Sequence, residues 1–143
     1  MTPQTVSRMP ILPTFWPIGV FFMLQMASGT ALANEIDDLV PIIVQTESSG
    51  DPGALGDQGK ARGLMQIQET TWVRLSEWPW SDAFDPEKNL MVGRKRLEEI
   101  SEKWNTTDPA VLAWHWNCGD NSKLTFDRWK KTQKNKTYRS LYQ

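Results

Sequence analysis

Residues 47–67 read ESSGDPGALGDQGKARGLMQI, and more can be inferred about the fold from this stretch than from any other. It begins with Glu47, and glycine then recurs at every third position, at 50, 53, 56 and 59. Glycine reaches backbone conformations that other residues avoid, and aspartate beside proline or glycine is typical of turns. We therefore predict a tight, turn-rich loop or a short hairpin that directly follows a helix.

Helical periodicity surrounds this loop on both sides. The clearest pattern begins where Asp85 can cap a helix and Pro86 suits its first turn, and it continues to Trp104. Gly93 falls in its apolar stripe and leaves a gap where another backbone could approach closely. The expected helices are 38–48, 69–77, 86–104, one that opens at the Asp108-Pro109 pair, and, more weakly marked, 124–134. These patterns predict a mainly α, compact single domain of about five helices.

Composition limits the classes of protein to which the chain could belong. It has 143 residues, enough for one ordinary domain, and 39% of them are hydrophobic, which supports a packed core. Sixteen lysines and arginines against 17 acids argue against a nucleic-acid partner, although seven of the eight charged residues from 123 onward are basic. That basic tail is either a solvated surface or an attraction for an anionic polymer. One histidine and one cysteine exclude a zinc finger and a disulfide framework, and Cys118 is expected to be buried and inert rather than an exposed thiol.

The first 33 residues have the pattern of a secretory signal peptide. Arg8 is the only charged residue before Glu35, an apolar run covers 18–27, and Ala31-Leu32-Ala33 offers a cleavage site. A run of ten residues is too short to span a bilayer, which argues against a membrane anchor. We predict a signal peptide at 1–33, a mature domain at 34–143 without a stable membrane anchor, and a periplasmic or secreted location.

Glu47 is the strongest candidate for a catalytic group. Ile36, Val40 and Ile43 precede it at helical spacing, which places its carboxyl on the apolar face of the first helix. Pro41 fits this helix only if it lies in the first turn. Burial and the carbonyl end of the helix both favour the neutral carboxyl that a general acid requires. The alternative is a surface glutamate at a frayed helix end.

Three blocks in the same order resemble the soluble lytic transglycosylase (SLT) family, whose lysozyme-like α+β fold is related to that of goose-type lysozymes. The first is Glu47-Ser48 followed by 59–67, GKARGLMQI, which matches the family's Gly-x-x-Gly-Leu-Met-Gln-Ile. The second is the segment 85–93, DPEKNLMVG, and the third is 113–119, AWHWNCG, which is similar to Ala-x-x-Tyr-Asn-x-Gly. The resemblance covers about residues 36–119.

The resemblance implies a peptidoglycan lytic transglycosylase that acts without a cofactor or metal. Glu47 would protonate the β-1,4 bridge oxygen between N-acetylmuramic acid and N-acetylglucosamine, then deprotonate the muramyl C6 hydroxyl, giving a 1,6-anhydro product. By the same resemblance Ser48 supports the substrate's N-acetyl group, Met65 and Gln66 line the cleft, and Asn117 holds the saccharide or orients the acid. The implied partners are glycan strands of peptidoglycan and, for so small a domain, a secretion, conjugation or phage machine.

One departure from the family pattern concerns the acid itself. Trp116 stands where the family carries tyrosine, so the hydroxyl expected beside Glu47 is missing from this position. Trp116 could instead stack on a sugar ring or pack in the core.

Other functions remain open on the sequence. A lysozyme-type hydrolase would pair Glu47 with a second carboxylate, for which Asp51 and Asp57 are the local candidates, although both also fit ordinary turn chemistry. A non-catalytic peptidoglycan-binding protein would use the tryptophans without turnover. A nucleophilic pair of His115 and Cys118 lacks an orienting third group.

Overall fold

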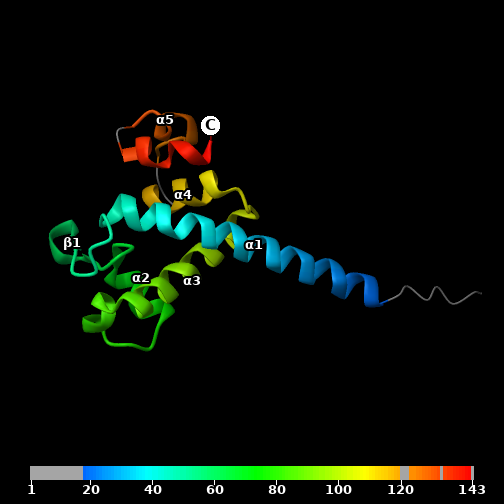
Figure 1. Ribbon diagram of the computed structural model, residues 1–143, viewed down its shortest axis with the longest axis horizontal. Helices are drawn as coiled ribbons and strands as arrows, with labels where there is room; N and C mark the ends of the chain where they lie inside the picture. The colour runs from blue at the N-terminus through cyan, green and yellow to red at the C-terminus, as the bar shows by residue number, and fades with distance from the viewer. Residues whose placement is uncertain (1–17, 120–122, 133, 143) are drawn as a thin grey trace, which may run out of the picture.

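The computed structural model describes residues 18–119, 123–132 and 134–142, and it is mainly α-helical with a small sheet, as predicted (Figure 1). The α-helices are α1 (Ile18–Glu47), α2 (Glu69–Leu75), α3 (Pro86–Trp104), α4 (Pro109–Cys118) and α5 (Phe126–Trp129). The 3-10 helices are η1 (Asp57–Gly59), η2 (Trp80–Phe84) and η3 (Lys134–Leu141). The strands are β1 (Leu55–Gly56), β2 (Ala61–Arg62) and β3 (Ile67–Gln68).

Helix α1 runs between two groups of elements. In Figure 1, α4, α5 and the C-terminal segment lie on one side of it, and α2, α3 and the sheet lie on the other. Its buried face comprises Ile36, Leu39, Val40 and Ile43, each 5% exposed or less. The same face precedes Glu47 at the spacing predicted from the sequence. The core is therefore built around the last turns of α1, next to the candidate acid.

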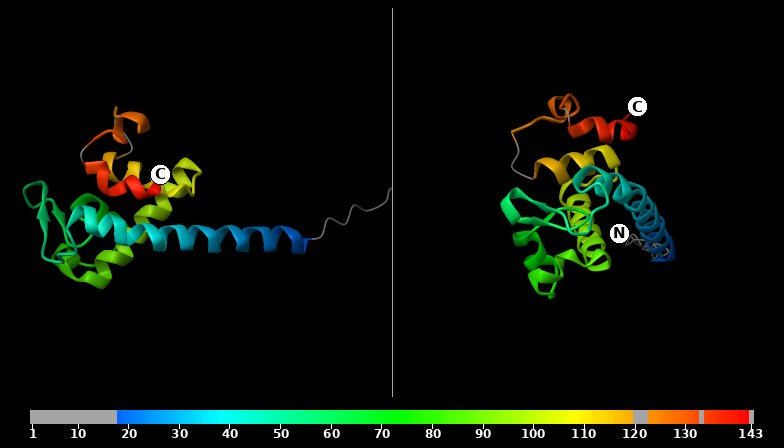
Figure 2. Two further views of the ribbon diagram at one scale, coloured as in Figure 1. Left: turned by 45° about the horizontal axis from the view of Figure 1, so that its top comes forward. Right: turned by 60° about the vertical axis from the view of Figure 1, so that its left-hand side comes forward.

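The start of α1 differs from our expectation. The helix begins at Ile18 rather than near residue 38, and its N-terminal half projects beyond the rest of the domain (Figure 2). Pro41 therefore lies in the helix interior, where its missing N–H removes one backbone hydrogen bond. Its side chain is exposed, so the proline ring occupies no space in the core. Among the described residues, no helix is both long and apolar enough to cross a membrane.

The predicted cap of α3 is confirmed, and α4 opens at the Asp108-Pro109 pair as predicted. The Asp85 carboxylate accepts a hydrogen bond from the Lys88 backbone N–H at 3.0 Å. Asp108 accepts from the backbone N–H of Ala110 at 2.8 Å and of Val111 at 3.3 Å. In each helix a proline follows the cap, at a position where no partner for its N–H is required.

The glycine-rich loop forms a three-stranded antiparallel sheet in the order β1-β2-β3. Leu55 pairs with Arg62, and Arg62 pairs in turn with Ile67. The buried Asn89 of α3 ties this loop to the core: its Oδ1 accepts from the Met65 N–H at 2.9 Å, and its Nδ2 donates to the carbonyls of Arg62 and Ala83. The predicted short hairpin is thus extended by a third strand and anchored to a helix.

Three further expectations need correction. The gap at Gly93 is filled by the Met65 side chain rather than by a backbone, since a Cβ there would lie 2.1 Å from the Met65 sulfur. The helix expected at 124–134 is limited to the four residues of α5, capped by Thr125, and the chain then continues as η3. Helix α2 also ends two residues early, at Leu75, because the backbone of Ser76 is extended, with φ −139° and ψ 159°. The Ser76 N–H makes the last helical hydrogen bond, to the Trp72 carbonyl.

Candidate active site

Glu47 is the last residue of α1, half-buried, in a cleft of about 580 Å³. The cleft combines segments that are far apart in the sequence: the end of α1, the sheet, α2, α3 and the end of α4. It is lined by Glu47, Gly56, Asp57, Ala61, Gln66, Ile67, Gln68, Thr71, Arg96, Trp116, Asn117, Cys118 and Gly119. The carboxyl on the apolar face of the helix thus reaches a cavity large enough for a ligand.

Two donors contact the same oxygen of Glu47. Asn117 Nδ2 and the Tyr138 hydroxyl each lie 3.4 Å from Glu47 Oε1. The Asn117 amide is itself oriented by the indole of Trp129, whose Nε1 donates to Asn117 Oδ1 at 3.2 Å. Because that oxygen accepts from Trp129, the NH₂ group of Asn117 is the part that faces Glu47. The carboxyl is held from two elements, α4 and η3.

Tyr138 contacts the candidate acid and was not predicted from the sequence. Its side chain is fully buried, and burial, followed by the negative charge of Glu47, raises the pKa of its hydroxyl well above the ordinary value of 10.0. The hydroxyl therefore stays protonated and acts as a donor. Tyr138 thus places beside Glu47 the hydroxyl group that Trp116 lacks. The only sequence signal was a tyrosine in a basic tail with weak helical periodicity, which did not distinguish it from a surface residue.

Gln66 lies in the cleft as expected. Its Nε2 donates to the carbonyls of Ala54 and Gly63, each at 3.0 Å, and a Cβ on Gly56 would lie 2.1 Å from its Oε1. The backbone of Gln66 has a φ of 49°, a left-handed conformation that is uncommon for a residue with a side chain. Two hydrogen bonds, to Ala54 and Gly63, and close packing against Gly56 thus fix the position of the Gln66 amide next to the sheet.

Ser48 and Met65 are placed differently from the expectation. The Ser48 hydroxyl bonds to the Val44 carbonyl at 3.1 Å and accepts from the Gly50 N–H, so it closes the end of α1 outside the cleft lining. Met65 is fully buried against Gly93 rather than lining the cleft. Its contribution is to pack the loop on α3.

Trp116 and Cys118 both line the cleft and are half-buried. For Cys118 this corrects the expectation of a buried, inert side chain.

His115 is buried, and its ring stacks on that of Trp104 with centroids 4.2 Å apart. His115 is not part of the cleft lining, so the structure does not assemble the His115–Cys118 pair there. Across the part of the chain that the structure describes, no three acidic, histidine or cysteine side chains are grouped as a metal site would require.

The two candidate second carboxylates are separated by the fold. Asp51 is exposed and accepts from the Gly53 N–H at 2.8 Å, an ordinary turn contact outside the cleft lining. Asp57 lines the cleft with Glu47, and its Oδ2 accepts from Gln68 Nε2 at 3.2 Å. Of these two residues, Asp57 alone shares the cavity with the acid.

Comparison with known proteins agrees with the sequence blocks. The family model described as transglycosylase SLT domain matches residues 27–141. A protein named Transglycosylase from Enterobacteria phage PRD1 is 38% identical over 90 residues, which make up 63% of this chain and 32% of the phage protein. The matched part of the chain therefore spans about a third of that relative. No solved structure matches this chain. Because the family model covers most of the chain, the protein belongs to the SLT family of lysozyme-like lytic transglycosylases.

Proposed function

We propose that this protein is a peptidoglycan lytic transglycosylase that cleaves the β-1,4 bond between N-acetylmuramic acid and N-acetylglucosamine. The observation that supports this most directly is the position of Glu47, half-buried in the cleft with Asn117 and Tyr138 each 3.4 Å from its carboxyl. Family membership supports the reaction class, and the phage relative bears the name of the activity. Gln66, Trp116 and Asn117 are the proposed saccharide contacts.

In the proposed reaction Glu47 acts twice. As an acid it gives its proton to the bridge oxygen, and the bond from that oxygen to the muramyl anomeric carbon breaks. As a base it then takes the proton of the C6 hydroxyl, whose oxygen bonds to the anomeric carbon of the same sugar. The product is a 1,6-anhydro ring, no water is consumed, and Glu47 is protonated again, now with the proton of the C6 hydroxyl. Asn117 and Tyr138 hold the carboxyl in one position for both steps.

Replacement of Glu47 by Gln distinguishes an enzyme from a binding protein. The variant should lose about 10²–10⁴-fold in release of soluble fragments from isolated peptidoglycan while it still binds the polymer. Glu98→Gln is the matched control, because Glu98 is exposed on α3 and outside the cleft lining. If wild type binds but releases nothing, the chain is a peptidoglycan-binding module and the proposal is wrong.

A lysozyme-type hydrolase is the second candidate, and the observation that favours it is Asp57 in the cleft with Glu47. A hydrolase with this pair should lose most of its activity in Asp57→Asn. The transglycosylase should keep most of it, since its two proton transfers both use Glu47. Asp51→Asn, at an exposed turn, is the matched control.

We further propose that residues 1–33 are a signal peptide, that residues 34–143 form the catalytic domain, and that it acts in the periplasm or outside the cell, without a stable membrane anchor. The substrate supports this location, since peptidoglycan lies outside the cytoplasm. A wall-spanning secretion, conjugation or phage machine is the proposed setting for so small a domain. Intact mass of the protein recovered from the cell envelope should correspond to a chain beginning at Asn34.

A further inference from the structure

A second groove continues from the catalytic cleft between α2 and α3. Its volume is about 650 Å³, and two of its lining residues, Thr71 and Arg96, also line the cleft that contains Glu47. The groove is lined by Thr71, Arg74, Arg96, Glu99, Glu102 and Lys103. The shared wall means that a ligand in the cleft could extend directly into the groove.

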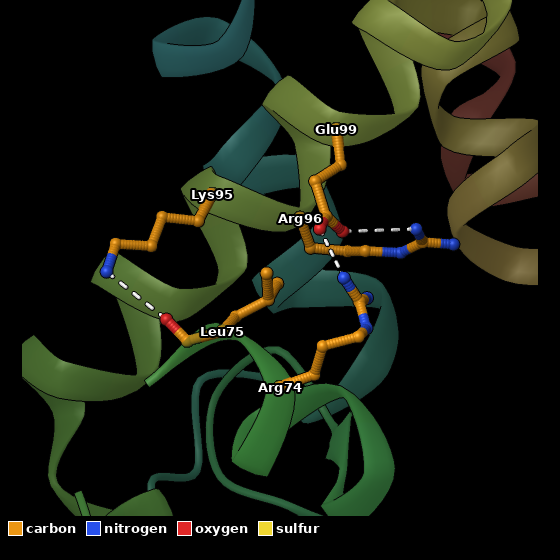
Figure 3. A network of polar contacts seen from close by, with 5 residues as sticks. All are labelled: Arg74, Leu75, Lys95, Arg96 and Glu99. Atoms are coloured by element: carbon orange, nitrogen blue, oxygen red, sulfur yellow. Dashed lines mark hydrogen bonds and ion pairs between the residues drawn. The ribbon is translucent and has the colours of Figure 1, made fainter. Parts of the chain in front are cut away.

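A carboxylate of α3 organises the cations of this groove. Glu99 lies between two guanidinium groups, with one oxygen paired to Arg74 of α2 and the other 3.4 Å from Arg96 Nη1 (Figure 3). The pKa of Glu99 is lower than its ordinary value, mainly because Arg74 donates a hydrogen bond to its carboxylate. The carboxylate therefore remains charged near neutral pH and keeps both guanidiniums at the groove wall.

The groove carries a net positive charge. It contains the three cations Arg74, Arg96 and Lys103 against the two carboxylates Glu99 and Glu102. The Arg74 side chain is half exposed, at 50%, so solvent and ligands reach it. A guanidinium has five N–H donors in a planar fork that suits carboxylates, and it can pair with more than one acceptor.

We propose that this groove binds the carboxylates of the peptide stem attached to the muramic acid residue beside the scissile bond. The inference rests on the proposed function, because it takes the glycan to lie in the cleft against Glu47. Peptidoglycan stems are short peptides that branch from the muramyl ring and carry free carboxylates. A stem leaving the sugar at the cleavage site needs a path out of the cleft, and the groove shared through Thr71 and Arg96 provides one with cations along it.

The test compares two substrates with the full chain. One is glycan with intact stems, and the other is the same glycan after an amidase has removed them. The measured quantity is the ratio of kcat/KM on the stem-bearing strands to kcat/KM on the stripped strands. Wild type should prefer the stem-bearing glycan, and the preference should weaken as salt is raised, because the groove is open to solvent.

Arg74→Gln and Lys103→Gln each remove a cation that lines the groove but does not line the cleft. Each has a matched control of the same residue type on α3. Arg94 pairs with Asp37 of α1 and is 40% exposed, so Arg94→Gln also breaks an exposed ion pair between helices. Lys95 points away from the groove to the Leu75 carbonyl (Figure 3), so Lys95→Gln removes the same charge elsewhere.

The Arg74→Gln/Lys103→Gln double variant should lower the ratio by about three- to tenfold, as expected for partly exposed charge pairs, while the controls keep it. A ratio equal to that of wild type would overturn the groove proposal while leaving the proposed activity intact. A wild-type ratio of one would do the same. Failure of wild type to cleave either glycan would instead overturn the proposed function.

Discussion

At the scale of single residues, the site depends on how the Glu47 carboxyl is held. Trp116 removes a hydroxyl that the family pattern would place next to it, and Tyr138 approaches from another element to provide one. Asn117 adds an amide donor whose orientation is fixed by Trp129. The Glu47 carboxyl therefore has a hydroxyl donor beside it although Trp116 stands where the family motif has tyrosine.

Tyr138→Phe should lower kcat by about tenfold, because it removes one hydrogen bond to the carboxylate that forms when Glu47 gives up its proton. The bond is 3.4 Å long, so its contribution is placed at the weak end of the range for bonds to charged groups. KM should change less, since Tyr138 contacts the acid and is not among the residues that line the cleft. Tyr142→Phe is the matched control: its hydroxyl lies 3.4 Å from the Lys130 carbonyl. Equal rates for wild type and Tyr138→Phe would show that the hydroxyl has no part in positioning the acid.

Tyr138 also predicts a sensitivity of folding to alkaline pH. Its pKa is raised in the folded state, so the unfolded chain releases this proton first, once the pH passes the ordinary value of 10.0. The free energy of unfolding should therefore be fully retained below that pH and should fall as the pH rises above it. Urea denaturation at about pH 8 and about pH 11 measures the difference, which should be smaller in Tyr138→Phe than in wild type. An unchanged difference in the variant would assign the alkaline loss to other groups.

At the scale of elements, the sheet depends on glycine where the loop meets α3. Gly63 has a φ of 76°, and a Cβ there would lie 2.3 Å from the Ala83 carbonyl oxygen and 2.4 Å from Asn89 Nδ2. Asn89 is the residue that ties the loop to the core. The contact that anchors this loop to α3 is thus possible only with glycine at this position.

Gly63→Ala should lower the free energy of unfolding by about 2–4 kcal/mol, from backbone strain and the clash together. Gly59→Ala is the matched control, since Gly59 also has a positive φ, 89°, but open space around it. The control should lose only about 1 kcal/mol from the left-handed backbone. Urea denaturation measures both, and equal losses would mean that close packing at Gly63 is unimportant.

The elements that could be predicted from sequence are those fixed by local chemistry. The Asp-Pro pairs at Asp85 and Asp108 start α3 and α4 because cap and first turn are set by adjacent residues. The glycine-rich loop was recognised for the same reason. The start of α1 was not, because Pro41 was expected to lie in a first turn, whereas α1 continues through it. The shortness of α5 was not either, because the tail is arranged by packing of Trp129 and Tyr138 into the core.

At the scale of the whole molecule, the cleft joins the end of α1 to the sheet, to α2 and α3, and to the end of α4. Motif matching found Glu47, Gln66, Trp116 and Asn117 because each lies within a block of known pattern, and the structure brings these four together. It could not find Tyr138 or Trp129, which reach the site from beyond the last block. It also grouped Met65 with the site, although burial on α3 explains that residue.

The proposed mechanism requires that Glu47 alone carry both proton transfers and that no water enter the product. Mass spectrometry of the soluble products from isolated peptidoglycan distinguishes this reaction from hydrolysis, with wild type and Glu47→Gln run side by side. Wild type should release muropeptides ending in 1,6-anhydromuramic acid, and Glu47→Gln should release none. Reducing-end products heavier by one water would contradict it and would indicate hydrolysis with Asp57 as the second carboxylate.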